Sequence, residues 1–316
     1  MGEARHLAPP RRPSAILGAS ELNLDKWVEF VDGDDSGRWQ AGGLRPRPEQ
    51  GDGMARFSAN LSMLFTERPF LDRFGAAARS GFRGVECHDP YGFPATEIAT
   101  RLRDHGLTQV LFNLPMGDTT RGERGIACLP ERVEEFRAGV VQSVEYARAL
   151  GCPTVNCLAG NPTQHTKMAE ARRTLVDNLR YAADRLGEAG VQLVMEPLNR
   201  FEFPGYFVTH SGRALDIIDE TGSTNIKLQY DIYHMQRMEG DLAATIERLL
   251  PRIGHIQIGG NPGRHEPSVG EINFRFLIER IDALGYEGWI GAEYNPRGRT
   301  EDGLGWFSSY RTKSEG

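Results

Sequence analysis

The sequence predicts an α/β protein that folds as a single (β/α)8 barrel, and three observations support this prediction. From residue 56 onward, eight short apolar runs of strand length are separated by stretches whose apolar residues recur with the period of a helix. Strands separated by whole helices run parallel, because the chain must return before each new strand begins. The repeats occupy about 250 residues, the usual length of one closed barrel.

The elements follow in order along the chain. The expected strands are residues 57–64, 84–87, 109–114, 154–158, 191–195, 226–230, 253–258 and 289–292. The expected helices are residues 70–80, 95–105, 132–150, 169–189, 211–221, 242–250 and 274–284. Six of these helices are followed directly by a glycine, the usual stop for a helix: Gly81, Gly106, Gly151, Gly190, Gly222 and Gly285.

A doubly wound open sheet is the structural alternative to the barrel. Folds of that kind often bind a nucleotide through a glycine-rich loop that follows a strand. No such dinucleotide or P-loop fingerprint follows any of the expected strands. The sequence therefore favours the closed barrel.

The first 53 residues differ from the rest of the chain. They hold five of the 18 prolines, together with glycine–aspartate clusters such as residues 32–35, and they lack an apolar stretch of signal-peptide length. We expect residues 1–53 to form a disordered or loosely packed extension. Residues 54–316 are expected to form the catalytic barrel, with Met54 as the start of the functional fold.

Composition excludes several classes of protein. The chain has 37 Lys and Arg against 43 Asp and Glu, a formal net charge of −6, which argues against a nucleic-acid partner. No window approaches 18 consecutive apolar residues, so no membrane span is expected. The four cysteines form no CxxC pair, which favours buried thiols and a cytoplasmic location. The outer helices of barrels often form dimer interfaces, so the sequence leaves open whether the protein is a homo-oligomer.

Four polar residues stand at the ends of four successive apolar strands. They are Glu196, Asp231, Gln257 and Glu293, on the fifth to the eighth expected strand. The active site of a barrel lies at the C-terminal ends of its strands, so these side chains should point into one small volume. The alternative is that each one is an ordinary strand-end residue hydrogen-bonded to a loop.

Three carboxylates in one volume repel one another unless a cation neutralises them. Oxygen ligands favour a hard or borderline cation, Mg2+ or Mn2+. Such a cation can bind an α-hydroxycarbonyl substrate through two oxygens and acidify the adjacent C–H. One glutamate could then remove a proton and another return one to the neighbouring carbon through an enediolate. This is an aldose–ketose type isomerisation, which needs no organic cofactor.

Several segments resemble the hydroxypyruvate isomerase family of the xylose isomerase-like barrel superfamily. The segments are residues 57–65, 122–125, 150–160, 195–199, 230–234, 264–267, 270–273 and 291–298, and the resemblance covers about residues 56–308. It implies a divalent metal ion and interconversion of hydroxypyruvate with tartronate semialdehyde. It also implies that Glu196, Asp231, Gln257 and Glu293 are metal ligands, with Glu196 and Glu293 as the acid–base pair.

Five further residues are candidates for substrate binding. Arg264 and Arg124 could hold the carboxylate of a hydroxy-oxo acid through a guanidinium fork. His234, one turn beyond Asp231, could bind substrate or a neighbouring carboxylate. Glu86 and His88, at the end of the second strand, could line the pocket. For each of these residues, an ordinary structural role is the alternative.

The substrate itself stays open, because three loops at the barrel mouth depart from the family's pattern. They are residues 86–91, 117–120 and 294–296. A 2-oxo-tetronate isomerase would use the same metal site, whereas a keto-sugar epimerase usually has histidine where this chain has Gln257. An abasic-site endonuclease would need several zinc-binding histidines and a basic groove. A non-catalytic barrel that only binds a ligand is the alternative from a different class.

Overall fold

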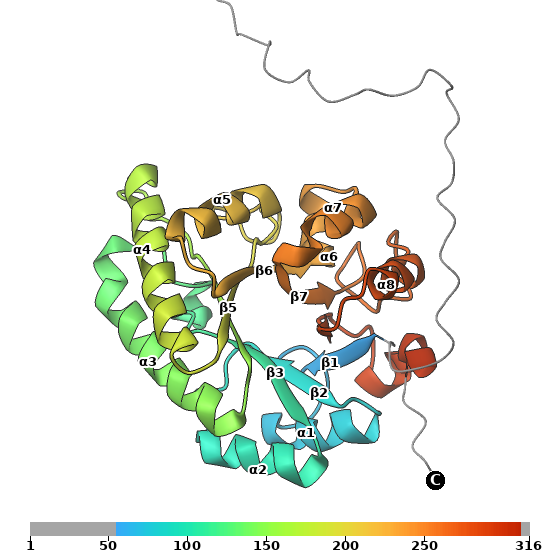
Figure 1. The fold of residues 1–316 in the computed structure, drawn as a ribbon. Coiled ribbons are helices and arrows are strands. Elements are labelled where there is room, and N and C mark those ends of the chain that lie inside the picture. The colour runs from blue at the N-terminus through green and yellow to red at the C-terminus, as the bar shows by residue number, and fades with distance from the viewer. Residues whose placement is uncertain (1–54, 311–316) are drawn as a thin grey trace, which may run out of the picture. The chain divides into compact units, whose positions relative to one another are not determined.

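The structure is a computed structural model that describes residues 55–310. Eight parallel strands follow one another around a closed barrel, and the last strand pairs with the first (Figure 1). The prediction of a single (β/α)8 barrel is confirmed. The segment 1–53, which the sequence sets apart, lies outside the described residues.

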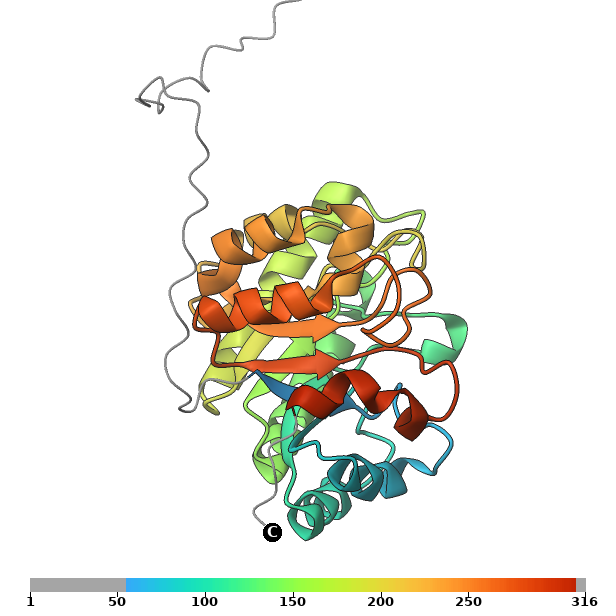
Figure 2. The ribbon, with the colours of Figure 1, turned by 90° about the vertical axis from the view of Figure 1, so that its right-hand side faces the viewer.

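The strands lie close to the expected positions. They are β1 (Arg56–Asn60), β2 (Gly84–Cys87), β3 (Thr108–Asn113), β4 (Thr154–Cys157), β5 (Gln192–Met195), β6 (Ile226–Asp231), β7 (Ile253–Ile258) and β8 (Trp289–Ala292). In the side view, the visible strand arrows point to one end of the barrel, where long loops gather (Figure 2). This end carries the strand-end residues that the sequence singles out.

The helices surround the strands (Figure 1). They are α1 (Phe70–Arg79), α2 (Ala95–His105), α3 (Val133–Leu150), α4 (Met168–Gly187), α5 (Ser211–Thr221), α6 (Ile232–Met238), α7 (Leu242–Leu249) and α8 (Phe274–Ala283). Four 3-10 helices complete the list: η1 (Thr119–Arg121), η2 (Pro130–Arg132), η3 (Leu250–Arg252) and η4 (Thr300–Tyr310). Helix α6 and the four 3-10 helices are absent from the elements expected above.

The first strand is shorter than its apolar run. The run 57–64 predicts a strand up to Leu64, but β1 ends at Asn60, whose carbonyl oxygen accepts the backbone N–H of Leu64 at 2.8 Å. Leu61 and Leu64 are fully buried in the turn that follows. Apolar character here reflects packing of a turn against the core, which periodicity does not distinguish from a strand.

Three of the six expected stop glycines cap their helices: Gly106, Gly151 and Gly222 directly follow α2, α3 and α5. Helices α1, α4 and α8 end one or two residues earlier than expected, so Gly81, Gly190 and Gly285 do not follow them directly. Gly106 and Gly151 both have a φ of 61°, in the left-handed region, and their backbone N–H groups bond to the last turns of α2 and α3. Glycine adopts this conformation without the steric cost that a Cβ adds.

The strands separate an apolar layer from a polar barrel interior. Phe57, Val85 and Ile256 are buried in the apolar core, as expected for side chains that face the helices. Their neighbours along the strands include Glu86 on β2 and Gln257 on β7, which hydrogen-bond to each other across the barrel at 2.7 Å. The interior below the strand ends is therefore a hydrogen-bonded polar network.

Within residues 55–310, no helix combines the length and the apolar character needed to cross a membrane.

Candidate active site

A cavity of about 400 Å3 opens at the C-terminal ends of the strands. Seven of the nine residues that the sequence singles out line it: Glu196, Gln257, Glu293, Arg264, His234, Arg124 and His88. Asp231 lies behind this wall, fully buried, and contacts two of the lining residues. Glu86 does not line the cavity, contrary to the expectation, because it lies deeper inside the barrel.

Arg264 connects two of the carboxylates. Its Nη2 atom lies 2.7 Å from Asp231 Oδ2 and 2.8 Å from Glu293 Oε1. The backbone of Arg264 has a φ of 53°, in the left-handed region, and its guanidinium packs over the ring of Tyr233 at 5.2 Å. The side chain is only 9% exposed, so these two ion pairs lie in a medium that screens charge weakly.

Asp231 uses its two oxygens differently. Oδ1 accepts the backbone N–H of Tyr233 at 2.8 Å and so caps the start of α6, while Oδ2 faces Arg264. Burial raises the pKa of Asp231 to about 7, although the charge of Arg264 opposes that rise. The capping bond fixes the direction in which the second oxygen points.

The two glutamates occupy different electrostatic environments. Burial, and then the negative charges of Glu293 and Asp231, raise the pKa of Glu196 well above its usual value. Burial also disfavours the charged form of Glu293, but Arg264 and then His88 lower its pKa to about 2. His88 Nε2 lies 2.9 Å from Glu293 Oε1, so the two groups that lower this pKa most touch the carboxylate.

The cluster holds three buried carboxylates, and Arg264 is the one side chain of permanent positive charge in contact with them among residues 55–310. Ligand atoms of Glu196, Asp231 and His234 lie within 4.8 Å of one another. An excess of negative charge and a set of oxygen donors are the features that a hard divalent cation requires. The three carboxylates therefore fit a divalent metal ion.

His234 adds a hydrogen-bond donor to this cluster, and its contacts with Asn199 show which ring nitrogen carries the proton. The backbone N–H and the side-chain Nδ2 of Asn199 lie 3.2 Å and 2.8 Å from His234 Nδ1. The orientation of the Asn199 amide is fixed because its Oδ1 accepts the backbone N–H groups of Phe201 and Glu202. Since both Asn199 groups are donors, Nδ1 must accept, and the neutral ring carries its proton on Nε2.

The proton on His234 Nε2 points toward acidic groups. This nitrogen lies 3.5 Å from Asp231 Oδ2 and 3.9 Å from Glu196 Oε1, and it has no hydrogen-bond partner within the described chain. Burial lowers the pKa of His234 well below its usual value. A neutral ring with an unused N–H is suited to donate to an oxygen of a bound molecule.

Arg124 reaches the cavity from the loop after β3. Its Nη1 donates to the carbonyl oxygen of Glu123 at 2.7 Å, and its guanidinium packs over the ring of Phe203 at 5.7 Å. The next residue, Gly125, has a φ of 92°, and a Cβ there would lie 2.1 Å from the carbonyl oxygen of Leu158. Only glycine allows this close approach of the two loops, which holds Arg124 at the cavity wall.

The polar residues inside the barrel include some that the sequence analysis did not single out. Asn156 donates to Glu196 Oε2 at 3.0 Å, and Gln229 donates to Gln257 Oε1 at 2.7 Å. Both residues alternate with apolar neighbours on their strands, a pattern that could have marked them. The sequence alone did not show which of the two faces of each strand was the barrel interior.

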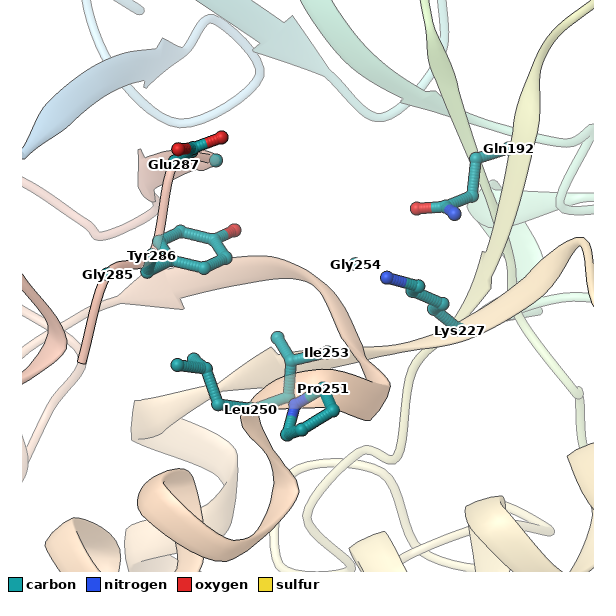
Figure 3. A pocket seen from close by; sticks show the side chains of 10 residues that line it. Gln192, Lys227, Leu250, Pro251, Ile253, Gly254, Gly285, Tyr286 and Glu287 are labelled. Atoms are coloured by element: carbon teal, nitrogen blue, oxygen red, sulfur yellow. The ribbon is translucent and has the colours of Figure 1, made fainter.

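A second cavity, of about 390 Å3, lies at the opposite end of the barrel (Figure 3). It is lined by residues at the beginnings of β5, β6 and β7 and just before β8, including Gln192, Lys227 and Tyr286. Lys227 is the one cation among its lining residues, and none of the predicted site residues reaches it. The candidate active site is therefore the cavity at the C-terminal ends.

Comparisons with known proteins agree with the barrel fold. A family profile described as "Xylose isomerase-like TIM barrel" matches residues 74–310. The chain belongs to this family. Within the xylose isomerase-like TIM barrel family, it is 50% identical over 258 residues to a protein of Escherichia coli K12 named hydroxypyruvate isomerase, covering 82% of this chain and all of that protein.

A second relative in the xylose isomerase-like TIM barrel family carries a different substrate in its name. The protein named 2-oxo-tetronate isomerase from Cupriavidus necator is 47% identical over 257 residues, covering 81% of this chain and 99% of that protein. These relatives confirm the resemblance to the hydroxypyruvate isomerase family and the predicted class of enzyme, an isomerase.

Solved structures of other proteins share the barrel. A protein from Brucella melitensis described as AP endonuclease, family 2, is 46% identical with a TM-score of 0.80, covering 82% of this chain and all of that one. D-psicose 3-epimerase from Clostridium cellulolyticum is 19% identical with a TM-score of 0.65, covering 79% of this chain and 89% of that one. At this identity, the second likeness supports the fold alone.

Proposed function

We propose that the protein is a metal-dependent isomerase that interconverts hydroxypyruvate and tartronate semialdehyde. The observation that carries this proposal is the position of Glu196 and Glu293. Both line one cavity beside Asp231 and Gln257, and Arg264 balances only part of their negative charge. Two carboxylates that line one small cavity are suited to moving a proton between neighbouring carbons.

Glu196, Asp231, Gln257 and Glu293 would hold the metal, Mg2+ or Mn2+. Such a cation, when bound, polarises the carbonyl of an α-hydroxycarbonyl compound and makes the adjacent C–H more acidic. No organic cofactor is required, because the reaction moves protons and leaves the substrate with no net change in oxidation state.

The glutamates perform the proton transfers. One takes a proton from C3 of hydroxypyruvate, which leaves an enediolate, and the other delivers a proton to C2. The hydroxyl proton on O3 is lost and one is gained on O2, so that C3 becomes the aldehyde and C2 the carbinol of tartronate semialdehyde. Asn156 holds Glu196 through Nδ2, and His88 holds Glu293 through Nε2, so both carboxylates have fixed orientations.

The substrate carboxylate requires a cation outside the carboxylate cluster. Arg264 Nη2 is engaged by Asp231 and Glu293, whereas Arg124 donates to one backbone carbonyl and faces the same cavity. We therefore assign the carboxylate of the substrate to Arg124 and a charge-balancing role to Arg264. The Nε2–H of His234 is positioned to donate to a substrate oxygen.

A 2-oxo-tetronate isomerase is the second candidate. Relatives with that name and relatives named hydroxypyruvate isomerase match this chain at similar identity, 47% and 50%. The same pair of glutamates would serve either substrate, since both are α-hydroxycarbonyl acids. We further propose that the enzyme acts in the cytoplasm on a free small molecule, in keeping with its free, buried cysteines and its net charge of −6.

Substitution of each glutamate by its neutral isostere tests the proposal. Glu196→Gln and Glu293→Gln should each lower kcat at least about 100-fold, the usual contribution of a general acid or base, while each variant still folds, as checked by a cooperative thermal unfolding transition. A folded variant that retains a tenth or more of wild-type kcat would remove that residue from the acid–base pair.

A further inference from the structure

Glu86 is a buried carboxylate that no step above uses. It is fully buried on β2, outside the lining of the substrate cavity, and it accepts four hydrogen bonds. The donors are Ser58 Oγ at 2.8 Å, Asn60 Nδ2 at 3.2 Å, His255 Nε2 at 2.9 Å and Gln257 Nε2 at 2.7 Å. A carboxylate in a barrel interior is costly unless its oxygens are satisfied in this way.

A glycine on β8, the strand on the far side of β1 from β2, leaves space for this carboxylate. A Cβ at Gly291 on β8 would lie 2.5 Å from both oxygens of Glu86. Any side chain at this position would therefore displace the carboxylate. The glycine and the four donors together form a built site for an anionic group below the active site.

A directional chain of hydrogen bonds runs from Glu86 to the cavity. Because a carboxylate only accepts, Gln257 must turn its NH2 group toward Glu86 and its Oε1 away from it. Gln257 Oε1 then accepts Nε2 of Gln229 at 2.7 Å. Gln229 Oε1, at the end of the chain, is buried and has no hydrogen-bond partner within residues 55–310.

Both amides line the active-site cavity, and Glu86 does not. Without Glu86, either amide could rotate by half a turn, because its oxygen and its NH2 group have nearly the same shape. An NH2 group is a donor and cannot ligate a cation, whereas an amide oxygen can. The polarity of the chain therefore decides whether this wall of the cavity offers oxygen ligands.

We propose that Glu86 is a positioning residue that fixes the polarity of the Gln257–Gln229 amide pair, so that both side chains present oxygen atoms to the active site. Gln257 Oε1 is then free to ligate the metal, and Gln229 Oε1 accepts a hydrogen bond from a hydroxyl group of the substrate. This inference rests on the proposed function, because it assumes that Gln257 is a metal ligand.

Two substitutions distinguish an effect of hydrogen-bond direction on metal affinity from effects of the volume and the charge of residue 86. Glu86→Met keeps most of the volume and removes every acceptor. Glu86→Gln removes the charge, but its amide oxygen can still accept from Gln257, since Ser58 and His255 can each accept from the new NH2 group. If Glu86 acts by orienting the two amides, only the Met variant should lose metal affinity. A role through charge alone predicts a loss in both variants, and a role through volume predicts a loss in neither.

Titration calorimetry of Mn2+ into metal-free protein measures this directly. We expect Glu86→Met to bind Mn2+ at least about tenfold more weakly, as is usual when a residue that orients a metal ligand is removed. Glu86→Gln should stay within about threefold of the wild type. Ser58→Ala, the matched control that removes one donor from Glu86 without touching either amide, should do the same.

Gln229→Met keeps the experiment decisive if Glu86→Met does not fold. Because Glu86 and not Gln229 orients the amide of Gln257, this variant should keep its Mn2+ affinity within about threefold. It should raise KM for hydroxypyruvate, because the acceptor for the substrate hydroxyl is lost. A tenfold loss of Mn2+ affinity in Glu86→Gln or in Gln229→Met, or wild-type affinity in folded Glu86→Met, would overturn the inference. Absence of Mn2+ binding by the wild-type protein would overturn the proposed function as well.

Discussion

The Nη2 atom of Arg264 lies 2.7 Å from Oδ2 of Asp231, although Asp231 ends β6 and Arg264 lies in the loop after β7. The same nitrogen contacts Glu293 at 2.8 Å. One nitrogen thus joins the ends of β6 and β8, at a point where two carboxylates would otherwise repel each other. This relationship makes Arg264 part of the charge balance of the site.

Replacement of Arg264 by alanine should therefore destabilise the metal-free protein. Breaking a buried ion pair by removal of one partner costs about 3–5 kcal/mol, because the other charge stays buried. We expect Arg264→Ala to lower the free energy of unfolding by about 3 kcal/mol in urea titrations that contain EDTA. Excess Mn2+, at about 100 times its Kd, should raise the free energy of unfolding of the variant by about 2–3 kcal/mol.

Arg124→Ala is the matched control for that experiment. Arg124 lines the same cavity but donates to a backbone carbonyl and touches no carboxylate of the cluster in the described residues. Its removal should change the free energy of unfolding by less than about 1 kcal/mol. Equal destabilisation by the two substitutions would show that Arg264 does not balance the carboxylates.

Arg124 should instead be required for recognition of the acid. A hydrogen bond to a charged group contributes about 1.5–3 kcal/mol, so Arg124→Ala should raise KM for hydroxypyruvate by about 10–100-fold. The value for a neutral keto-sugar, measured with the same preparation, should change little. A similar rise for both compounds would remove Arg124 from the role of carboxylate anchor.

The four cysteines should be inert in the folded protein. Cys87, Cys128, Cys152 and Cys157 are free and buried, and burial raises the pKa of each thiol, to about 12 for Cys128 and Cys152. A thiol reacts as its thiolate, so Ellman's reagent at pH 8 should modify none of them within minutes and all four after denaturation. Rapid reaction of any thiol in the native protein would contradict this burial.

The barrel should not need the first 53 residues. A variant that begins at Met54 keeps the whole region described by the structure, and the match to the relative of 50% identity spans 258 residues. We expect the shortened protein to unfold at the same temperature and to have the same kcat and KM as the full chain. A lower unfolding temperature or a loss of activity would show that the segment is part of the functional fold.

The sequence predicts the barrel and its strand ends well, for a physical reason. Parallel strands buried on both faces appear as short apolar runs, and the polar residue that ends such a run must lie at the common C-terminal end. This argument places Glu196 and Glu293 at one cavity, as the structure does. Helix α6 was missed because it starts directly after β6, with Asp231 serving both as strand end and as helix cap.

The contacts between loops are beyond such reasoning. The position of the Arg264 guanidinium depends on a left-handed backbone conformation, which a pattern of apolar residues does not indicate. The tautomer of His234 is set by Asn199, from a loop 35 positions earlier in the chain. The role of Glu86 depends on Ser58 of the adjacent strand β1 and on Gln257 of β7, which lies across the barrel and comes near only when the barrel closes.

Proton exchange followed by NMR in D2O tests the central claim, a metal-dependent proton transfer on a small keto acid, most directly. The protein is incubated with hydroxypyruvate, a 2-oxo-tetronate and a keto-hexose in parallel. We predict that solvent deuterium enters hydroxypyruvate at the carbon next to its carbonyl as tartronate semialdehyde forms, that EDTA stops the exchange, and that Mg2+ restores it. Full exchange in the presence of EDTA, or no exchange with either acid in the presence of Mg2+, would contradict it.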